Sequence, residues 1–151
     1  MAVTLPTQGG DTGTWGTELN AFISGSGAAY LGEVAEVDLN TASAKTTLYT
    51  VPTDHVAVIT GVLIINDSGV SAAGCNDVSF GTDATCTTWL QSVDLSGMTS
   101  ITATSYDTRY IFSMGVWPLL VAEGVFGVYV NTAATGAATA RMIVFGMEVA
   151  A

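Results

Sequence analysis

Residues 56–65 read VAVITGVLII, and this stretch decides the fold class. Valine, isoleucine and threonine are branched at Cβ and are enriched in strands, so the stretch predicts a long β-strand. Gly61 interrupts it, which indicates a β-bulge or the close approach of another backbone. Residues 142–145, MIVF, repeat this character near the end of the chain. Neither 56–59 nor 142–145 contains a polar residue.

Strands that are apolar on both faces need two covers. In an isolated antiparallel sheet, one face packs on the core and the other is polar and wet. The sandwich core would cover one face of residues 56–59 and 142–145. The second cover is either another subunit or the chain's own loops.

Further strands are expected from residue 33 onward. Period-two alternation between Gly, Asn, Asp and Pro predicts them at 33–40, 45–51, 78–81, 87–93, 98–104, 109–114, 119–121, 125–131 and 140–149. Residues 52–54 predict a turn, and the small residues 133–140 predict a hairpin loop. Because Thr, Val and Gly dominate, helices are disfavoured. The sequence therefore predicts an all-β domain over residues 33–151, an antiparallel β-sandwich or jelly roll.

The charge balance excludes several partners. The chain has 151 residues, with three basic side chains against thirteen acidic ones and a net charge of −10. Nucleic acid and anionic membrane surfaces attract clustered Lys and Arg, so neither is an expected partner. No apolar run approaches the roughly 20 residues of a membrane span, and the start lacks the features of a secretion signal. A low charge content with 49% hydrophobic residues suits a chain that buries surface against copies of itself.

The first residues have a different composition. Residues 5–23 read LPTQGGDTGTWGTELNAFI, and four glycines, four threonines and a proline cannot build a core. The segment nevertheless holds large apolar side chains, namely Trp15, Leu19, Phe22 and Ile23. We expect an arm that becomes ordered on a partner, with Gly13 and Gly16 letting a backbone approach the Trp15 ring. Residues 17–23 could form a short helix, and the small residues 24–32 are expected to be a linker.

Residues 6–20 of this arm resemble a segment near the start of many tailed-bacteriophage virion proteins. That segment reads Pro-x-x-Gly-Gly-Asp-x-Gly-x-Trp-Gly-x-x-Leu-Asn, and every fixed position is matched. It recurs on tail and head fibres of different kinds. The resemblance implies a virion protein, and three-fold symmetry is what a likeness to phage fibres implies.

Catalytic and metal chemistry are not expected. His55 is the one histidine, it follows the 52–54 turn, and no nucleophile or orienting partner is evident beside it. Asp67, Asp77, Asp83 and Asp94 fit no calcium-binding spacing, so we expect no metal and no cofactor. Cys75 and Cys86 lack a CxxC pattern and are expected to be free and buried, a disulfide being the alternative.

The remaining candidates are cations and aromatic residues. Arg109 and Arg141 are expected to form ion pairs within or between subunits. A set of aromatic residues could form either core and interface anchors or a sugar-stacking surface: Trp89, Tyr106, Tyr110, Trp117, Phe126 and Tyr129.

These observations give a two-part hypothesis. Residues 1–32 form an anchoring arm and linker, and residues 33–151 form a β-sandwich that assembles as a homotrimer. The protein is expected to be a non-enzymatic head fibre or capsid decoration protein, made in the bacterial host cytoplasm and bound to the major capsid protein or another virion protein. The alternatives are a tail fibre or adhesin that binds host glycans, and a bacterial carbohydrate-binding module.

Overall fold

The computed structural model describes residues 29–66, 68–99, 107–112 and 117–151. Every regular element in these ranges is a β-strand, and they contain no helix long and apolar enough to cross a membrane. The strands are β1 (Ala29–Asp38), β2 (Ala44–Thr50), β3 (His55–Asn66), β4 (Asp77–Gly81), β5 (Leu90–Val93), β6 (Asp107–Phe112), β7 (Leu119–Leu120), β8 (Val125–Thr132) and β9 (Thr139–Ala150). The predicted all-β fold class is confirmed.

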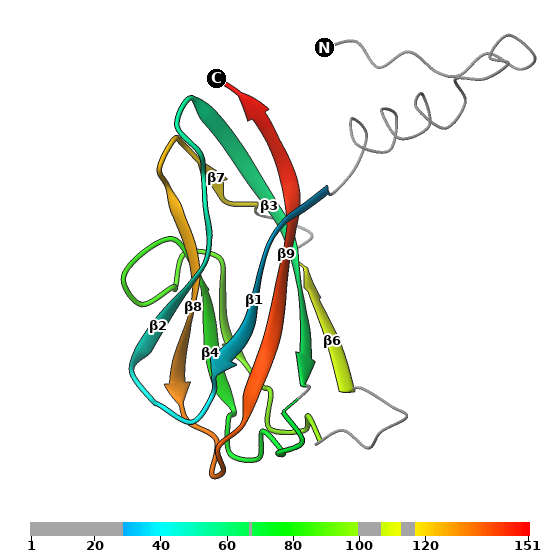
Figure 1. Ribbon diagram of the computed structural model, residues 1–151. Coiled ribbons are helices and arrows are strands. Elements are labelled where there is room, and N and C mark those ends of the chain that lie inside the picture. Colours follow the sequence, from blue (N-terminus) through cyan, green and yellow to red (C-terminus); the bar gives the residue numbers. More distant parts are fainter. Residues whose placement is uncertain (1–28, 67, 100–106, 113–116) are drawn as a thin grey trace, which may run out of the picture.

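The strands form two antiparallel sheets that face one another (Figure 1). Sheet A has the order β1-β9-β3-β6, with the short β7 also paired to β3, and sheet B has the order β2-β8-β4-β5. The pairing is nested: β1 pairs with β9, β2 with β8, β3 with β6 and β4 with β5. Nested pairs of this kind arise when one long hairpin is rolled up, which is the jelly-roll arrangement.

The core lies between the two sheets. Its largest fully buried side chains come from both sheets and from the loops, and they include Leu39, Ile59, Ile64, Phe80, Leu95, Met98, Phe126 and Met142. Fully burying one such side chain contributes roughly 1.5–3 kcal/mol. The core therefore fixes which face of each strand points inward.

Strands β3 and β9 form the centre of sheet A. Their pairing runs from His55↔Ala150 to Ile65↔Arg141, with one register shift between Ile59 and Gly61. The predicted bulge at Gly61 is thus confirmed. On β9 there is no shift, so Met142 and Val144 point into the core while Ile143 and Phe145 point to the outer face.

Three boundaries differ from the expectations. Strand β1 starts at Ala29 rather than residue 33, because Tyr30 pairs with Phe145 and Leu31 packs against the core, so residues 29–32 are strand rather than linker. Residues 87–89 lie in a loop before β5. Met98, expected to start a strand, instead ends a turn, where its N–H donates to the Leu95 oxygen.

The loop after β8 is also different from the prediction. Residues 133–138 do not close a hairpin, because β8 pairs with β2 and β4 in sheet B while β9 pairs with β1 and β3 in sheet A. The loop therefore crosses from one sheet to the other. Local composition predicted the loop correctly, but it could not predict which sheet the next strand joins.

Candidate interaction surface

The outer face of sheet B is polar and largely satisfied by its own contacts. Asn131 on β8 donates through Nδ2 to Asp77 Oδ1 at 3.0 Å and to Ser79 Oγ at 2.9 Å, both on β4. Lys45 on β2 and Tyr129 on β8 are paired neighbours on the same face. This is the ordinary state of an antiparallel sheet that has one wet face.

The loop of residues 82–89 covers one end of that polar face. The Asp83 carboxylate accepts hydrogen bonds from the Thr87 N–H at 2.6 Å and the Thr87 hydroxyl at 2.8 Å. These bonds, led by the one from the Thr87 side chain, lower the pKa of Asp83. Lys45 Nζ donates to the Asp83 carbonyl oxygen at 2.8 Å. Gly127 leaves room for this cover, since a Cβ there would lie 3.4 Å from the Cys86 sulfur and 2.7 Å from the Thr46 oxygen.

The outer face of sheet A has the opposite character. Most of its side chains on β3 and β9 are apolar and only partly covered or exposed, and Arg141 of β9 is charged. The apolar ones are Val56, Val58, Leu63, Ile65, Ile143, Phe145, Met147 and Val149. The register places them side by side, since Val58 pairs with Met147 and Leu63 with Ile143. The sequence-based expectation that both faces of these strands are apolar is therefore confirmed.

Four of the exposed apolar side chains lie toward one end of this face. Tyr30 is 60% exposed, Leu119 68%, Met147 42% and Val149 59%. Val58 lies between two of them, because it pairs with Leu119 on β7 and with Met147 on β9. We call these four residues the apolar end of sheet A. The C-terminal end of β9, β7 and the start of β1 all lie toward the upper end of Figure 1.

This end carries no outward-facing charge on its two central strands. Residues 56–61 of β3 contain no charged residue, and in residues 145–149 of β9 the charged one is Glu148, which points inward. The other charged side chains of β1 and β9 lie beyond Phe145, toward the opposite end. There, Arg141 Nη1 donates to Glu33 Oε1 at 2.8 Å. The predicted ion pair of Arg141 is confirmed, and the side chain of Arg109 lies outside the described residues.

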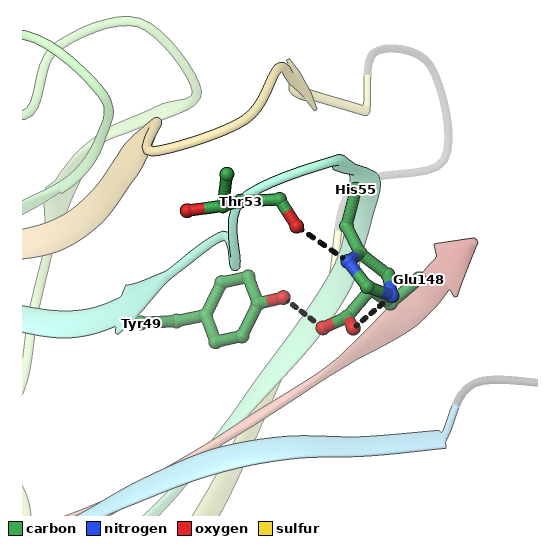
Figure 2. A network of polar contacts seen from close by, with 4 residues as sticks. All are labelled: Tyr49, Thr53, His55 and Glu148. Atoms are coloured by element: carbon green, nitrogen blue, oxygen red, sulfur yellow. Dashed lines mark hydrogen bonds and ion pairs between the residues drawn. The ribbon is translucent and has the colours of Figure 1, made fainter. Parts of the chain in front are cut away.

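A polar network holds the same end of β9 from inside the sandwich (Figure 2). The Tyr49 hydroxyl on β2 donates to Glu148 Oε2 on β9, which links sheet B to sheet A. His55 Nε2 lies 3.8 Å from Glu148 Oε1, and His55 Nδ1 lies 3.0 Å from the Thr53 carbonyl oxygen. A carbonyl oxygen only accepts, so the Nδ1 proton points at Thr53.

The network is suited to structure rather than proton transfer. Burial, followed by the hydrogen bond and the charge of Glu148, raises the pKa of Tyr49. The phenol therefore keeps its proton as a fixed donor to the carboxylate. Sequence patterns could not reveal this network, because Tyr49 and Glu148 are separated by 99 positions.

The arm residues proposed to dock on a partner lie outside the described residues. These are Gly13, Trp15, Gly16, Leu19, Phe22 and Ile23, and their role stays a prediction. What the structure describes is where the arm joins the domain. Ala29 pairs with Gly146, which directly precedes Met147 of the apolar end.

The aromatic residues do not form one surface. Phe126 is fully buried, and Trp89 packs on it edge to face with ring centroids 5.5 Å apart. Trp117 is exposed next to β7, whereas Tyr129 lies on the outer face of sheet B. The side chains of Tyr106 and Tyr110 lie outside the described residues.

Several of the described aspartate side chains accept hydrogen bonds from nearby residues, and the two cysteine side chains are buried. Within the described ranges, no three His, Cys, Asp or Glu side chains gather as metal ligands. Asp77 and Asp83 accept the bonds given above, Asp94 accepts from the Ser96 N–H at 2.8 Å, and Asp67 lies outside the description. Cys75 and Cys86 are free and buried, as predicted. Burial raises the pKa of Cys75 to about 11.

Comparison with known proteins gives one structural likeness. No protein-family model matches the chain, and no curated protein matches it. A chain of the cyanophage Pam1 capsid asymmetric unit superposes on 81% of this chain and 87% of its own length, with a TM-score of 0.47 and 15% sequence identity. At this TM-score and identity, the likeness establishes neither a common function nor a common partner.

Proposed function

We propose that this chain is a non-enzymatic structural protein of a tailed-bacteriophage virion. In this proposal it is a head fibre or capsid decoration protein, assembled in the host cytoplasm as a homotrimer. Residues 1–23 bind the major capsid protein or another virion protein, and the jelly roll projects from the particle. The proposal rests on the arm's resemblance to the start of phage virion proteins and on the apolar outer face of sheet A.

The observation that supports assembly best is the contrast between the two sheets. The outer face of sheet B is polar and its groups bond to one another, whereas the outer face of sheet A is apolar. Contiguous exposed apolar surface on a globular protein marks an interaction site. A partner surface on sheet A would remove from water the side chains that the fold itself leaves out.

The arm suits attachment for a separate reason. Binding would order a glycine-rich segment at a cost in backbone entropy of roughly 1–2 kcal/mol per residue, so it needs strong anchors. Trp15 is the largest of them, and tryptophan is among the residues that most often dominate interface energies. Gly13 and Gly16 flank it and leave space for a partner on either side of the ring.

Two observations support a non-enzymatic role. His55 is engaged with Thr53 and Glu148, with no nucleophile in the network that these residues form with Tyr49. Cys75 and Cys86 are buried thiols with raised pKa values. A thiol of raised pKa is disfavoured as a thiolate, which is the reactive form.

The test is binding to particles that lack this protein. The wild-type chain, a chain without residues 1–23, and Trp15→Ala are cosedimented with such particles. Truncation is expected to abolish binding, and Trp15→Ala is expected to weaken it by about thirtyfold, equivalent to roughly 2 kcal/mol. Thr12→Ala is the matched control, because Thr12 occupies a variable position of the same segment. Undiminished binding by the truncated chain would refute attachment through the arm.

Glycan recognition is the second candidate, either as a tail adhesin or as a bacterial carbohydrate-binding module. The exposed aromatic side chains Tyr30 and Trp117 favour it, because aromatic rings stack on sugars. The neighbouring Leu119, Met147 and Val149 are aliphatic and favour a protein partner instead. Binding on a glycan array without binding to particles would support this candidate over the virion role.

A further inference from the structure

We infer that the apolar end of sheet A, formed by Tyr30, Leu119, Met147 and Val149, is the surface on which a second copy of this chain packs. The inference rests on the proposed function in one respect only, the assumption that copies assemble. It narrows the contact surface from the outer face of sheet A to one end of that face, and it assigns a second copy as the occupant.

Charge selects this surface for contact between identical chains. Each copy carries a net charge of −10, so two copies repel one another over most approaches. Association of such chains requires a region where no acidic group meets another. Along β3 and β9 the apolar end meets this condition, since residues 56–61 hold no charge and Glu148 points inward to Tyr49. The exposed Asp54 lies at the margin of this end, where its carbonyl oxygen accepts from the Ala151 N–H.

The alternative surfaces are less suited to self-association. The outer face of sheet B holds Asp77, which already accepts a hydrogen bond from Asn131, and the loop of residues 82–89 covers one end. The opposite end of sheet A holds Glu33, whose carboxylate forms an ion pair with Arg141. Burying either region would remove polar groups from water without a new partner, which is costly.

The apolar end is also held rigidly. Strands β3 and β9 lie in the middle of sheet A, with β1 on one side and β6 and β7 on the other. From inside, Glu148 ties β9 to Tyr49 of the second sheet, between the outward residues Met147 and Val149. A surface held in this way loses little conformational entropy on binding. More of the free energy gained by burying its apolar area therefore contributes to the binding affinity.

The place where the arm joins the domain favours a second copy over an unrelated protein. Residues 1–28 precede Ala29, whose neighbour Tyr30 is itself part of the apolar end. Copies that pack through this end therefore bring together the points at which their arms join the β-sandwich. Arms gathered at one point can bind neighbouring sites on one particle at the same time, which multiplies their affinity.

The test measures the oligomeric state of the full chain in solution, without particles. Sedimentation equilibrium compares wild type with Met147→Glu on β9 and Leu119→Glu on β7. Thr47→Glu is the matched control, because it adds the same charge at an exposed position on the outer face of sheet B. Thermal melting by circular dichroism checks that all four proteins are folded. Since positions 47, 119 and 147 are exposed, folding should not change.

The wild type and Thr47→Glu are expected to sediment as trimers. Met147→Glu and Leu119→Glu should need an about tenfold or higher concentration to assemble, because each buries an unpaired charge in the contact. A monomeric wild type, or trimers in all four proteins, would overturn the inference. Equal weakening by Thr47→Glu would also overturn it, because the effect would then come from net charge.

A chain without residues 1–23 tests the other occupant of this surface, the arm itself. If copies pack through the apolar end, the truncated chain stays trimeric. A truncated chain that becomes monomeric and binds an apolar dye would show that the arm covers the surface, and would overturn the inference. Trimers that resist Met147→Glu but bind particles through the arm would leave the virion role standing.

Discussion

Replacing Gly146 by alanine should disrupt the centre of sheet A. Gly146 lies on β9 opposite Ile59, next to the bulge that ends at Gly61. A Cβ built on Gly146 would fall far inside the contact distance of the Val58 carbonyl oxygen and 2.7 Å from Leu31 Cδ1. The first of these is backbone and cannot rotate away. The new methyl group therefore has to push β3 and β9 apart.

The cost follows from what must move. Inserting a methyl group into a filled site costs about 1–3 kcal/mol in strain. Separating the strands at this pair also weakens one or two ladder hydrogen bonds, each with a net value of about 0.5–1.5 kcal/mol. Alanine restricts the unfolded chain more than glycine does, which stabilises the folded state by about 0.4–1 kcal/mol and offsets part of this loss. We therefore expect a loss in the middle of this range, about 3 kcal/mol, which lowers the melting temperature by about 6–12 °C for a chain of this size.

Urea and thermal unfolding at one fixed protein concentration measure the loss, since assembly makes apparent stability depend on concentration. Gly32→Ala on the edge strand β1 is the matched control. Its Cβ would lie 3.3 Å from the Leu48 oxygen, so a small shift relieves it, and the expected change is under about 1 kcal/mol. If Gly146→Ala is no less stable than Gly32→Ala, the argument from close strand approach is wrong.

Three further outcomes are expected. Thr60→Val should raise stability by about 1–2 kcal/mol in urea unfolding, because the Thr60 hydroxyl is buried with no hydrogen-bond partner among the described residues; a loss would contradict this. Tyr49 holds its proton more tightly when folded, so wild-type stability should fall as pH rises past about 10, and Tyr49→Phe should show a shallower fall between pH 8 and 11. Equal slopes would refute this. Cys75 and Cys86 are free, so reducing agent should not shift the melting temperature, and thiol reagents should react only after unfolding. A drop of many degrees on reduction would indicate a disulfide.

Most of the fold could be predicted from the sequence because each strand has a local signal. The β-branched stretch 56–65 and the apolar stretch 142–145 predicted the two central strands of sheet A, and Gly61 predicted the bulge between them. The pairing of the strands has no local signal. The small residues of the loop at 133–138 are typical of a hairpin loop. The loop instead connects the two sheets, because β8 and β9 each pair with strands that are distant in the sequence.

The interaction surface could be predicted as a property of strands but not as a set of residues. Two-sided apolarity indicated that β3 and β9 need a second cover. It could not indicate Leu119, because that residue reaches the surface through β7, where it pairs with Val58 from a distant part of the chain while Leu120 pairs with Ala57. The link between Tyr49 and Glu148 was missed for the same reason, since it depends on how the two sheets face one another.

The two sheets of this jelly roll expose outer faces of opposite character. Sheet B bonds its own polar groups and accepts a loop over one end, so water can cover the rest at little cost. Sheet A leaves apolar side chains outward at the end where the arm begins. A chain with a net charge of −10 can expose such a surface without random aggregation, because the charge elsewhere keeps other approaches apart. In the proposed assembly, association is restricted to the orientation that joins the apolar ends, and the arms that this orientation brings together would bind the proposed virion partner at more than one site.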